Sequence, residues 1–519
     1  MLLLALFLRL EGIHNPVLDR PGWRQGDTAA IARNFAVLQY NVFYPQTSYD
    51  GPPPNYVELE LQIVPFLAAT LYKLAGVHEV FGRLITLAFS LGTVAVIGAF
   101  ARWLFAGSVA GVFAALLYAV MPGSIYYGRT FTPDATMVFF LAAALYAAAR
   151  LFVEEEVWKA PAIVRVTALF ALAYLAKPVA VVALVPLAAL LIDRVRAGRT
   201  LSLPGAALIF ALPLIVLWGY DAFVTSHAEW HWTSGITAHH VLPSLRDSLS
   251  GAHALSMKLA QFKAILSMLA RTMIGPAITA IAILGFAFMP AATRSRSLLW
   301  GWLIGGLAYT YVVVTVERVD YYMMLLLPLA ALSGGGFLER LCTAVARSGA
   351  ARAVKAALAA AGILALAGTT DQNLAIIKPY YHFSKIVYHR ATALNATLPR
   401  QALIVMGHYD PSVLYYIGRY GWEEDPYLWT PFDEESAIQK GARYFIAIER
   451  NRFNRNVELC AWMQRFPVLD PAAAWPVFHT DPAFVKRGAE AQWRSFRNAE
   501  RVGGARAWLD AHRLCALSP

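Results

Sequence analysis

One stretch near the beginning of the chain gathers side chains that could do chemistry. Between residues 19 and 60, charged residues stand between strongly apolar segments, and they are Asp19, Arg20, Arg24, Asp27, Arg33, Asp50, Glu58 and Glu60. Charges near a bilayer are costly, so they usually pair with one another, face water or serve a function. Beside Asp27, Arg24 and Arg33 are expected to bind phosphate or to hold the carboxylate ionised.

Each of these acids also has a plain structural explanation. Asp27 precedes a helical pattern through Ile31, where an Asp often caps the helix. Glu58 and Glu60 are two positions apart, so on a helix they point in different directions and only one would face the Asp27 region. Alternatively, both are solvated residues at a helix N-terminus. Asp50 stands before Gly-Pro-Pro-Pro and is expected to be a turn residue.

Three more charged residues join apolar segments further along the chain. Asp134 follows a proline and suits a helix start, so it is either a cap or a partner for Arg129. Arg129 is expected to pair with Asp134 or to bind an anion. Lys177 lies between apolar runs of about 15 residues, short of the roughly 20 needed to cross a bilayer, so it is expected to bind an anion in a recess or to snorkel to the interface.

A last charged group occurs where Arg318 is followed by Tyr321 and Tyr322. These side chains are expected to hold a phosphate and a sugar, or to form part of an interfacial aromatic belt. The histidines between residues 225 and 271 lack the close spacing of metal ligands, so no metal site is predicted there.

The composition indicates which kind of structure holds these residues in place. The 519 residues are 58% hydrophobic and 15% charged, whereas a soluble domain averages roughly 45–50% apolar and about 25% charged. The excess comes in long apolar blocks, so the chain is predicted to be a mainly α, polytopic membrane protein. Its net charge of +11 fits Lys and Arg in cytoplasmic loops and does not call for a nucleic-acid partner.

The apolar blocks predict about 11 transmembrane helices plus an interfacial one. They fall at residues 2–10, 61–75, 84–105, 108–127, 135–153, 162–176, 178–192, 203–224, 272–290, 298–316, 321–338 and 353–368. Segment 61–75 begins with acids and contains a proline, which favours a helix lying at the interface. If this segment does not cross the membrane, the arginine-rich loops fall on one side, as the positive-inside rule requires. The polar residues that are costly near a bilayer then fall on the other side.

Residues 1–368 are therefore expected to form a transmembrane domain. Residues 11–83 would be its first periplasmic loop, with interfacial helices, and residues 225–271 a second, partly ordered loop. From residue 369 the composition changes, and strand-like runs at 402–406 and 444–448 alternate with helical patterns, as in a small periplasmic α/β domain. Cys460 and Cys515 both fall in this tail, and the sequence leaves open whether they pair or stay free.

The order of these features resembles the glycosyltransferase family 39 type of integral-membrane enzyme, within the GT-C superfamily. This group includes protein O-mannosyltransferases and lipid A aminoarabinose transferases. The similar motifs are Trp23-Arg-Gln-Gly-Asp27, Tyr56-Val-Glu58-Leu-Glu60, Tyr127-Gly-Arg129, Pro133-Asp134-Ala135, Leu175-Ala-Lys177-Pro178, Arg318 with Tyr321-Tyr322 and Tyr415-Tyr416-Ile-Gly-Arg419-Tyr420-Gly421. Each motif is common alone, but their order is fairly specific and covers essentially the whole chain.

The resemblance implies an inverting glycosyltransferase with a polyprenyl-phosphate-linked sugar donor. The acceptor would be a hydroxyl or amine of a glycan, lipid or protein, at the periplasmic face of a bacterial inner membrane. Asp27 would be the catalytic carboxylate and Glu60 the second, with Glu58 in reserve. The substrate-binding residues would be Arg24, Glu58, Arg129, Asp134, Lys177, Arg318, Tyr321 and Tyr322. No cofactor is implied, and a divalent metal is not indicated.

Two departures from the family pattern and three rival functions stay open. Family members often place an Asp-Glu pair farther from the Ile-Ala-Arg run than Asp27 is, and some carry Lys-Pro where this chain has Leu61-Gln62. The rivals are a transporter or flippase for lipid-linked sugars, a ligase that moves glycans from a lipid diphosphate, and a non-catalytic scaffold. A transporter would use the same cations but would need no base at Asp27.

Overall fold

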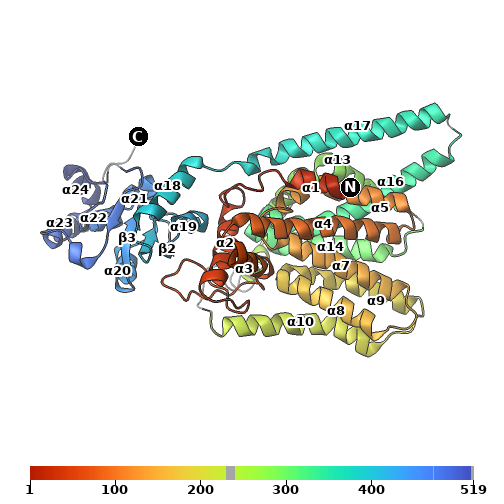
Figure 1. Cartoon of the computed structure of the whole chain (residues 1–519), viewed down its shortest axis with the longest axis horizontal. Helices are drawn as coiled ribbons and strands as arrows, with labels where there is room; N and C mark the ends of the chain where they lie inside the picture. Colours follow the sequence, from red (N-terminus) through yellow and green to blue (C-terminus); the bar gives the residue numbers. More distant parts are fainter. Residues whose placement is uncertain (229–239, 291, 350, 471–472, 516–519) are drawn as a thin grey trace. The chain divides into compact units, whose positions relative to one another are not determined.

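The computed structural model describes residues 1–228, 240–290, 292–349, 351–470 and 473–515. Its contacts divide the chain into two compact units (Figure 1). Met1–Asn15 and Glu58–His382 form the first, which we call the membrane unit, and Pro16–Val57 and Phe383–Pro519 form the second, which we call the loop–tail unit. The boundary expected between residues 368 and 369 falls inside a helix of the membrane unit.

Helices make up the membrane unit. Its first half contains α1 (Leu2–Arg9), α3 (Ile63–Ala75), α4 (Glu79–Leu104), α5 (Ser108–Val120), α6 (Pro122–Tyr127), α7 (Asp134–Val153), α8 (Ala160–Ala176), η1 (Pro178–Ala183), α9 (Leu184–Arg196) and α10 (Leu203–Thr225). Its second half contains α11 (Leu242–Ser248), α12 (Ala252–Met268), η3 (Leu269–Ile274), α13 (Pro276–Ala287), α14 (Arg296–Tyr309), η4 (Thr310–Val314), α15 (Thr315–Glu317), η5 (Asp320–Leu326), α16 (Leu327–Arg347), α17 (Arg352–Ile377) and η6 (Lys378–Tyr381).

Seven helical segments in the described part of the chain are long and apolar enough to cross a bilayer. A further pair, Ala252–Ile274 and Pro276–Ala287, is bent by 108° where its two helices join. If this pair is counted as one span, there are eight. The mainly helical, polytopic fold is therefore confirmed, while the count of about 11 spans stays a prediction. Helix α3 has 13 residues, fewer than the roughly 20 that a crossing needs, as expected of an interfacial helix.

Part of the second expected loop is helical instead. Residues 225–271 were expected to be a partly ordered loop, but α11 and α12 occupy most of its described portion. Helix α12 continues into η3, and the chain then bends at Gly275, whose φ of +91° favours glycine. The polar residues on α12 make this segment less apolar than the other helices, so composition alone did not reveal the bent helix pair.

Small residues let the helices of the membrane unit approach closely. Where α13 meets α16, a Cβ added at Gly285 would lie 2.2 Å from the carbonyl oxygen of Ser333. The Ser333 hydroxyl donates a hydrogen bond to the Ala282 carbonyl, 2.7 Å away. Close backbone contact and interhelical hydrogen bonds hold membrane helices together where burial of apolar surface cannot.

The two ends of this helical bundle carry different side chains. At one end Arg294 pairs with Glu154, and Arg194 donates to the carbonyl oxygens of residues 152, 155 and 156. At the other end the Tyr127 hydroxyl donates to the Asp320 carboxylate, 2.6 Å away. The basic loops thus lie at one end of the membrane unit, and Tyr127 and Asp320 lie at the other.

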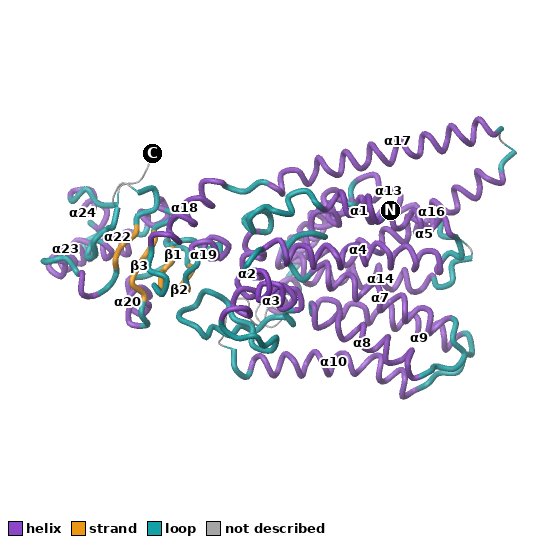
Figure 2. Tube along the Cα trace, viewed as in Figure 1, coloured by secondary structure: helices purple, strands orange, loops and turns teal. Residues whose placement is uncertain are grey.

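The loop–tail unit contains a four-stranded sheet, drawn in orange in Figure 2. Its helices are α2 (Gly22–Val37), α18 (Lys385–Thr397), α19 (Pro411–Ile417), α20 (Pro431–Gln439), α21 (Arg450–Arg455), α22 (Val457–Met463), η7 (Pro482–Phe484), α23 (Ala489–Arg501) and α24 (Ala505–Ala511). Its strands are β1 (Leu403–Met406), β2 (Tyr420–Glu423), β3 (Ala442–Ile446) and β4 (Val477–His479). The strand order is β2-β1-β3-β4, and only β4 is antiparallel to its neighbour. The predicted small α/β domain is therefore present.

The first loop of the chain is part of this same unit. The backbone N–H of Gly51 donates to the Gly421 carbonyl at 2.9 Å, and the N–H of Gly421 donates to the Ser48 carbonyl at 3.2 Å. The Tyr420 hydroxyl donates to the Asn34 side chain at 2.9 Å. Residues 48–51 thus extend the sheet at its β2 edge, and the motif around Tyr420 and Gly421 has a structural role.

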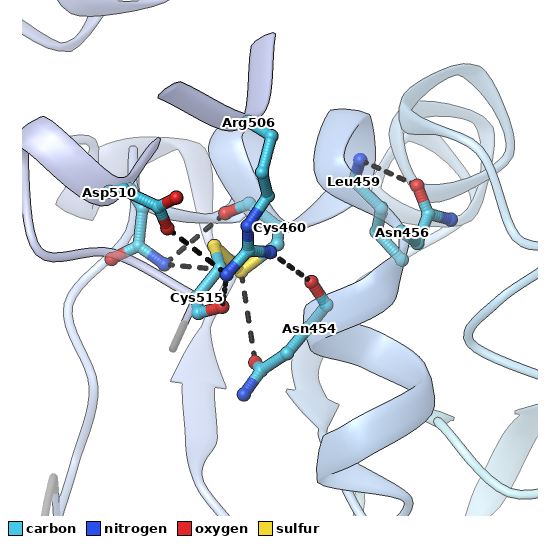
Figure 3. The surroundings of a disulfide bond; sticks show 8 residues. Asn454, Asn456, Leu459, Cys460, Arg506, Asp510 and Cys515 are labelled. Atoms are coloured by element: carbon cyan, nitrogen blue, oxygen red, sulfur yellow. Dashed lines mark hydrogen bonds and ion pairs between the residues drawn. A yellow bond between two sulfur atoms is a disulfide. The ribbon is translucent and has the colours of Figure 1, made fainter. Parts of the chain in front are cut away.

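Cys460 and Cys515 form a disulfide in the loop–tail unit (Figure 3). The bond closes a sequence separation of 55 residues, which settles the choice that the sequence left open. Around it, Arg506 donates to the carbonyl oxygens of Asn454 and Cys515 at 3.2 and 3.0 Å.

Replacing Cys460 and Cys515 together by Ser is expected to lower the stability of the loop–tail unit by about 2–5 kcal/mol, because the cross-link no longer restricts the unfolded chain. Thermal unfolding in detergent measures the loss. Thiol labelling of the denatured parent protein should find one reactive cysteine, the exposed Cys342, without reductant and three with it. Three reactive thiols before reduction would contradict the disulfide.

Candidate active site

A buried ion pair lies at the polar end of the membrane unit. The Lys177 ammonium is 2.5 Å from Oδ1 of Asp134, and the two residues are 6% and 0% exposed. Lys177 sits in extended backbone between α8 and η1, and Asp134 is the first residue of α7. Asp134 therefore is not a helix cap and pairs with Lys177 rather than with Arg129, and Lys177 does not snorkel to the interface.

Aromatic rings surround this pair. The Lys177 ammonium lies 4.2 Å from the ring centre of Tyr322 and 5.0 Å from that of Tyr321, distances at which ring faces attract cations. Asp320 anchors the segment, because its carboxylate accepts from Tyr127 and from the backbone N–H of Tyr321. Four of the residues expected to bind substrate, Asp134, Lys177, Tyr321 and Tyr322, are thus brought together.

The two expected arginines of the membrane unit have different surroundings. Arg129 is fully buried, donates to the Gly12 carbonyl at 3.0 Å and lies 4.7 Å from the ring centres of Tyr126 and Tyr381. Arg318 is exposed and has a φ of +54°. Within the described ranges its guanidinium makes no hydrogen bond or ion pair, so it is open to an anion.

Glu58 and Glu60 do not lie on a helix. Helix α3 starts only at Ile63, with Gln62 as its N-cap residue, so the helical reasoning applied to the two acids was wrong. The segment is irregular and both side chains are half-buried. The N–H of Leu61 donates to the carbonyl of Leu175 at 2.9 Å, which ties the residue after Glu60 to the turn that carries Lys177.

Asp27 lies in the second turn of α2, in the loop–tail unit. It is 2% exposed, and α2 begins five residues earlier at Gly22, so Asp27 is not the helix cap. Trp23 on the same helix stacks on Tyr409 with ring centres 6.1 Å apart. Arg24 is half-buried, and its carbonyl accepts a hydrogen bond from Thr28.

Tyr49 is the side chain beside Asp27 that the sequence did not single out. Burial, followed by the negative charges of Asp27, Glu423 and Asp50, raises the pKa of Tyr49 well above its usual value of 10. Tyr49 therefore remains a neutral phenol. No periodic pattern in residues 38–57 marks this position.

A glycine sets the distance between Asp27 and the tail. A Cβ added at Gly26 would lie 2.4 Å from the Cα of Ser412 on α19, so α2 can pack there only without a side chain. Gly26→Ala is expected to destabilise the loop–tail unit by about 1–3 kcal/mol, seen as a lower unfolding temperature. The matched control is Gly22→Ala on the same helix, whose added Cβ would be 3.4 Å from its nearest neighbour; equal losses in both variants would contradict the close contact.

Comparisons with known proteins decide the fold. Residues 62–220 match the family model described as dolichyl-phosphate-mannose-protein mannosyltransferase, and no curated protein matches the chain. The oligosaccharyltransferase from Archaeoglobus fulgidus in its apo form superposes with a TM-score of 0.60 at 12% identity, over 94% of this chain and 74% of that one. Apo ArnT from Cupriavidus metallidurans gives 0.56 at 14%, over 93% and 97%. The chain has the GT-C fold.

The structure of ArnT bound to undecaprenyl phosphate is also similar, with a TM-score of 0.53 at 14% identity. At such identities the GT-C fold is shared while the site residues need their own argument. Among the residues that the structure describes, no three His, Cys, Asp or Glu side chains form a group that would hold a metal ion. Asp27 and Arg24 belong to the loop–tail unit and the remaining candidate residues to the membrane unit, so each group is described by itself.

Proposed function

We propose that this GT-C protein transfers a sugar from a polyprenyl-phosphate-linked donor to a hydroxyl or amine acceptor. The observation that carries the proposal is the similarity to ArnT over 93% of this chain and 97% of that one, because that relative was solved with undecaprenyl phosphate. The family model matched by residues 62–220 is also named for a lipid-phosphate sugar donor.

Asp27 is proposed as the general base. It takes the proton from the acceptor hydroxyl, or from an amine, as the acceptor atom bonds to the anomeric carbon. The bond between that carbon and the phosphate oxygen breaks at the same time, and the lipid phosphate leaves with the electron pair. Attack from the face opposite the leaving group inverts the configuration. Glu60, with Glu58 as the alternative, is proposed as the second carboxylate.

Arg318 is the cation best suited to the leaving phosphate, because no ion pair in the described structure neutralises it. A fixed cation beside the oxygen that gains charge lowers the barrier to departure. Lys177 is already paired with Asp134, so it would share its charge between that carboxylate and the phosphate. Tyr321 and Tyr322 are proposed to contact the sugar or its phosphate, and Arg24, Arg129 and Asp134 are retained as proposed substrate-binding residues.

The site is proposed to face the periplasm of a bacterial inner membrane. The arginine-rich end of the membrane unit fits a cytoplasmic side, and the candidate residues of that unit lie at the opposite end. The disulfide of the loop–tail unit fits an oxidising compartment. We propose no cofactor and no nucleic-acid partner.

The test is donor turnover by the purified full-length protein in detergent. The protein is incubated with a panel of radiolabelled undecaprenyl-phosphate sugars, and the release of free undecaprenyl phosphate is measured for the parent and for Asp27→Asn. Release that depends on Asp27 supports the proposal and names the donor. Tight binding of one donor without release, in the presence of candidate acceptors, would favour the transporter.

A second candidate is a ligase that moves a whole glycan from a lipid carrier. The similarity to AglB, an oligosaccharyltransferase also solved with an inhibitory peptide and dolichol-phosphate, favours it. The same assay separates the two enzymes when lipid-diphosphate glycans are added to the panel. Release of lipid diphosphate would identify the ligase.

A further inference from the structure

A groove runs along the hairpin of α4 and α5, at the end of the membrane unit that carries Arg294. The two helices lie side by side (Figure 1), and the groove has a volume of about 1050 Å³. Ligand pockets usually measure about 300–1,000 Å³, so the groove is large enough for a whole ligand. None of its lining residues belongs to the candidate active site.

Small apolar residues form the walls of the groove. Val94, Ala95 and Ala99 of α4 and Val112 and Ala115 of α5 line it, and side chains of this size leave the space beside the helices unfilled. Ala95, Ala99 and Val112 are exposed. In a membrane helix, exposed apolar surface faces acyl chains, so the groove is open to lipid along its length.

The length of the groove matches one leaflet of a bilayer. Two glycines let the helices meet, because a Cβ added at Gly111 would lie 2.6 Å from the carbonyl oxygen of Gly98. Val94 and Arg102 both line the groove, and at 1.5 Å per residue they are ~12 Å apart along α4. One leaflet of the hydrocarbon core is about 15 Å deep, half of its roughly 30 Å thickness.

Positive charge lies at the mouth of the groove, near the end of α4. Arg102 is exposed and makes no hydrogen bond or ion pair in the described part of the chain. Arg294 also lines the groove, pairs with Glu154 and lies 5.4 Å from the ring centre of Trp103. Among the residues that the structure describes, no Asp or Glu lines the groove, so no carboxylate there neutralises Arg102.

Two acids near the tip of the hairpin already have partners. Glu154 accepts from the Trp103 indole N–H at 2.6 Å and pairs with Arg150 at 2.9 Å, in addition to Arg294. Glu339 accepts from the backbone N–H of Ala110 at 2.6 Å, at the start of α5, where the helix dipole stabilises a negative charge. The partner that suits Arg102 is therefore an anion from outside the protein.

We propose that this groove binds one anionic phospholipid. Its phosphate lies beside Arg102, and one of its acyl chains lies along the apolar walls of α4 and α5. Basic pockets between transmembrane helices bind anionic lipid headgroups, and a channel as long as a leaflet suits an acyl chain, which a soluble anion lacks. A zwitterionic lipid carries its own cation beside the phosphate, so it gains less from Arg102. The proposal does not depend on the proposed reaction.

Native mass spectrometry of the delipidated full-length protein in detergent tests the site. The protein is titrated with phosphatidylglycerol and, separately, with phosphatidylcholine that has the same acyl chains. The parent should retain one phosphatidylglycerol in preference to phosphatidylcholine. Arg102→Gln should weaken this retention about fivefold, the effect of one arginine near an anionic headgroup. Equal retention of the two lipids by the parent would show only unselective lipid contact and overturn the proposal.

Arg196→Gln is the matched control for Arg102→Gln. Arg196 is exposed in the last turn of α9, beside Arg194 of the same basic end, and does not line the groove. The control should retain phosphatidylglycerol as the parent does. Equal losses in the two variants would mean that net charge alone attracts the lipid, and this would overturn the proposal.

Ala99→Phe tests the acyl chain separately from the headgroup. The added ring occupies the groove without changing a charge, so retention of phosphatidylglycerol should fall at least as much as in Arg102→Gln. Its control is Ala359→Phe, at an exposed position of α17 that does not line the groove; this variant should bind as the parent does. Unchanged retention in Ala99→Phe would exclude the groove as the site. Thermal unfolding verifies that each variant keeps its fold.

The same spectra identify other occupants of the groove. Glycerol phosphate has no acyl chain and should not displace the lipid; displacement would indicate a site for soluble anions. A dimer that Ala99→Phe disrupts would mean that a second copy of the chain fills the groove. Tighter retention of undecaprenyl phosphate than of phosphatidylglycerol would indicate a polyprenyl lipid. Each of these three outcomes would overturn the proposal.

Discussion

Asp27→Asn is expected to lower donor turnover by about 10²–10⁴-fold, the usual contribution of a general base. Asn keeps the size of Asp, but its amide cannot take the acceptor proton. Because the residue is almost fully buried, the loop–tail unit must retain its fold for the loss to be attributed to chemistry. Turnover and thermal unfolding are measured on the same preparation.

The control for Asp27→Asn is Asp510→Asn, the same substitution at an exposed side chain of the loop–tail unit. Asp510 pairs with Arg506 at 3.2 Å on the surface, and exposed pairs contribute about 0–1 kcal/mol. This variant should turn over donor at the parent rate. Full activity in Asp27→Asn would remove Asp27 from the role of base.

The second large effect is expected at the buried pair of Lys177 and Asp134. Lys177→Met or Asp134→Leu leaves the other charge buried without its partner, which costs about 3–5 kcal/mol of stability. The double variant removes both charges and should recover most of the loss, because apolar residues can replace a buried ion pair at little cost. Thermal unfolding in detergent is measured for the parent, the two single variants and the double variant. The difference between the double loss and the sum of the single losses is the coupling energy of the pair.

The matched control for this cycle is the exposed pair of Arg497 and Glu458, 2.8 Å apart and about two-fifths exposed. The corresponding Arg497→Met and Glu458→Leu variants should each change stability by about 1 kcal/mol or less. Additive losses at Lys177 and Asp134 would mean that the pair is not coupled. Turnover by the double variant at the parent rate would exclude both residues from substrate binding.

The sequence predicted the elements well where the signal is local. The run of aliphatic residues at 402–406 corresponds to β1, Leu403–Met406, and the run at 444–448 overlaps β3, Ala442–Ile446. The apolar blocks correspond to helices of the membrane unit for the same reason, since composition over 15 to 25 residues decides whether a segment suits a bilayer. Breaks such as the one at Gly275 depend on packing and were not visible in composition.

The site residues were harder to place because their environment is set by distant parts of the chain. Helix capping was a reasonable explanation of Asp27 and Asp134, yet both carboxyls are buried. Asp134 pairs with Lys177, which is far away in sequence. A pattern of residues that are close in sequence does not predict contacts between residues that are far apart in the chain.

The pairing of the first loop with the edge of the tail sheet has a consequence for biosynthesis. Asn34 and Tyr420, which are hydrogen-bonded, lie 386 residues apart in the chain. At a translation rate of about 5–20 residues per second, the loop that carries Asp27 leaves the ribosome roughly 20–80 s before its partner strand. During that interval the loop has no sheet to join, so chaperones and membrane-insertion factors have a defined period in which to protect it, and chains cut short before the tail would never complete the surroundings of Asp27.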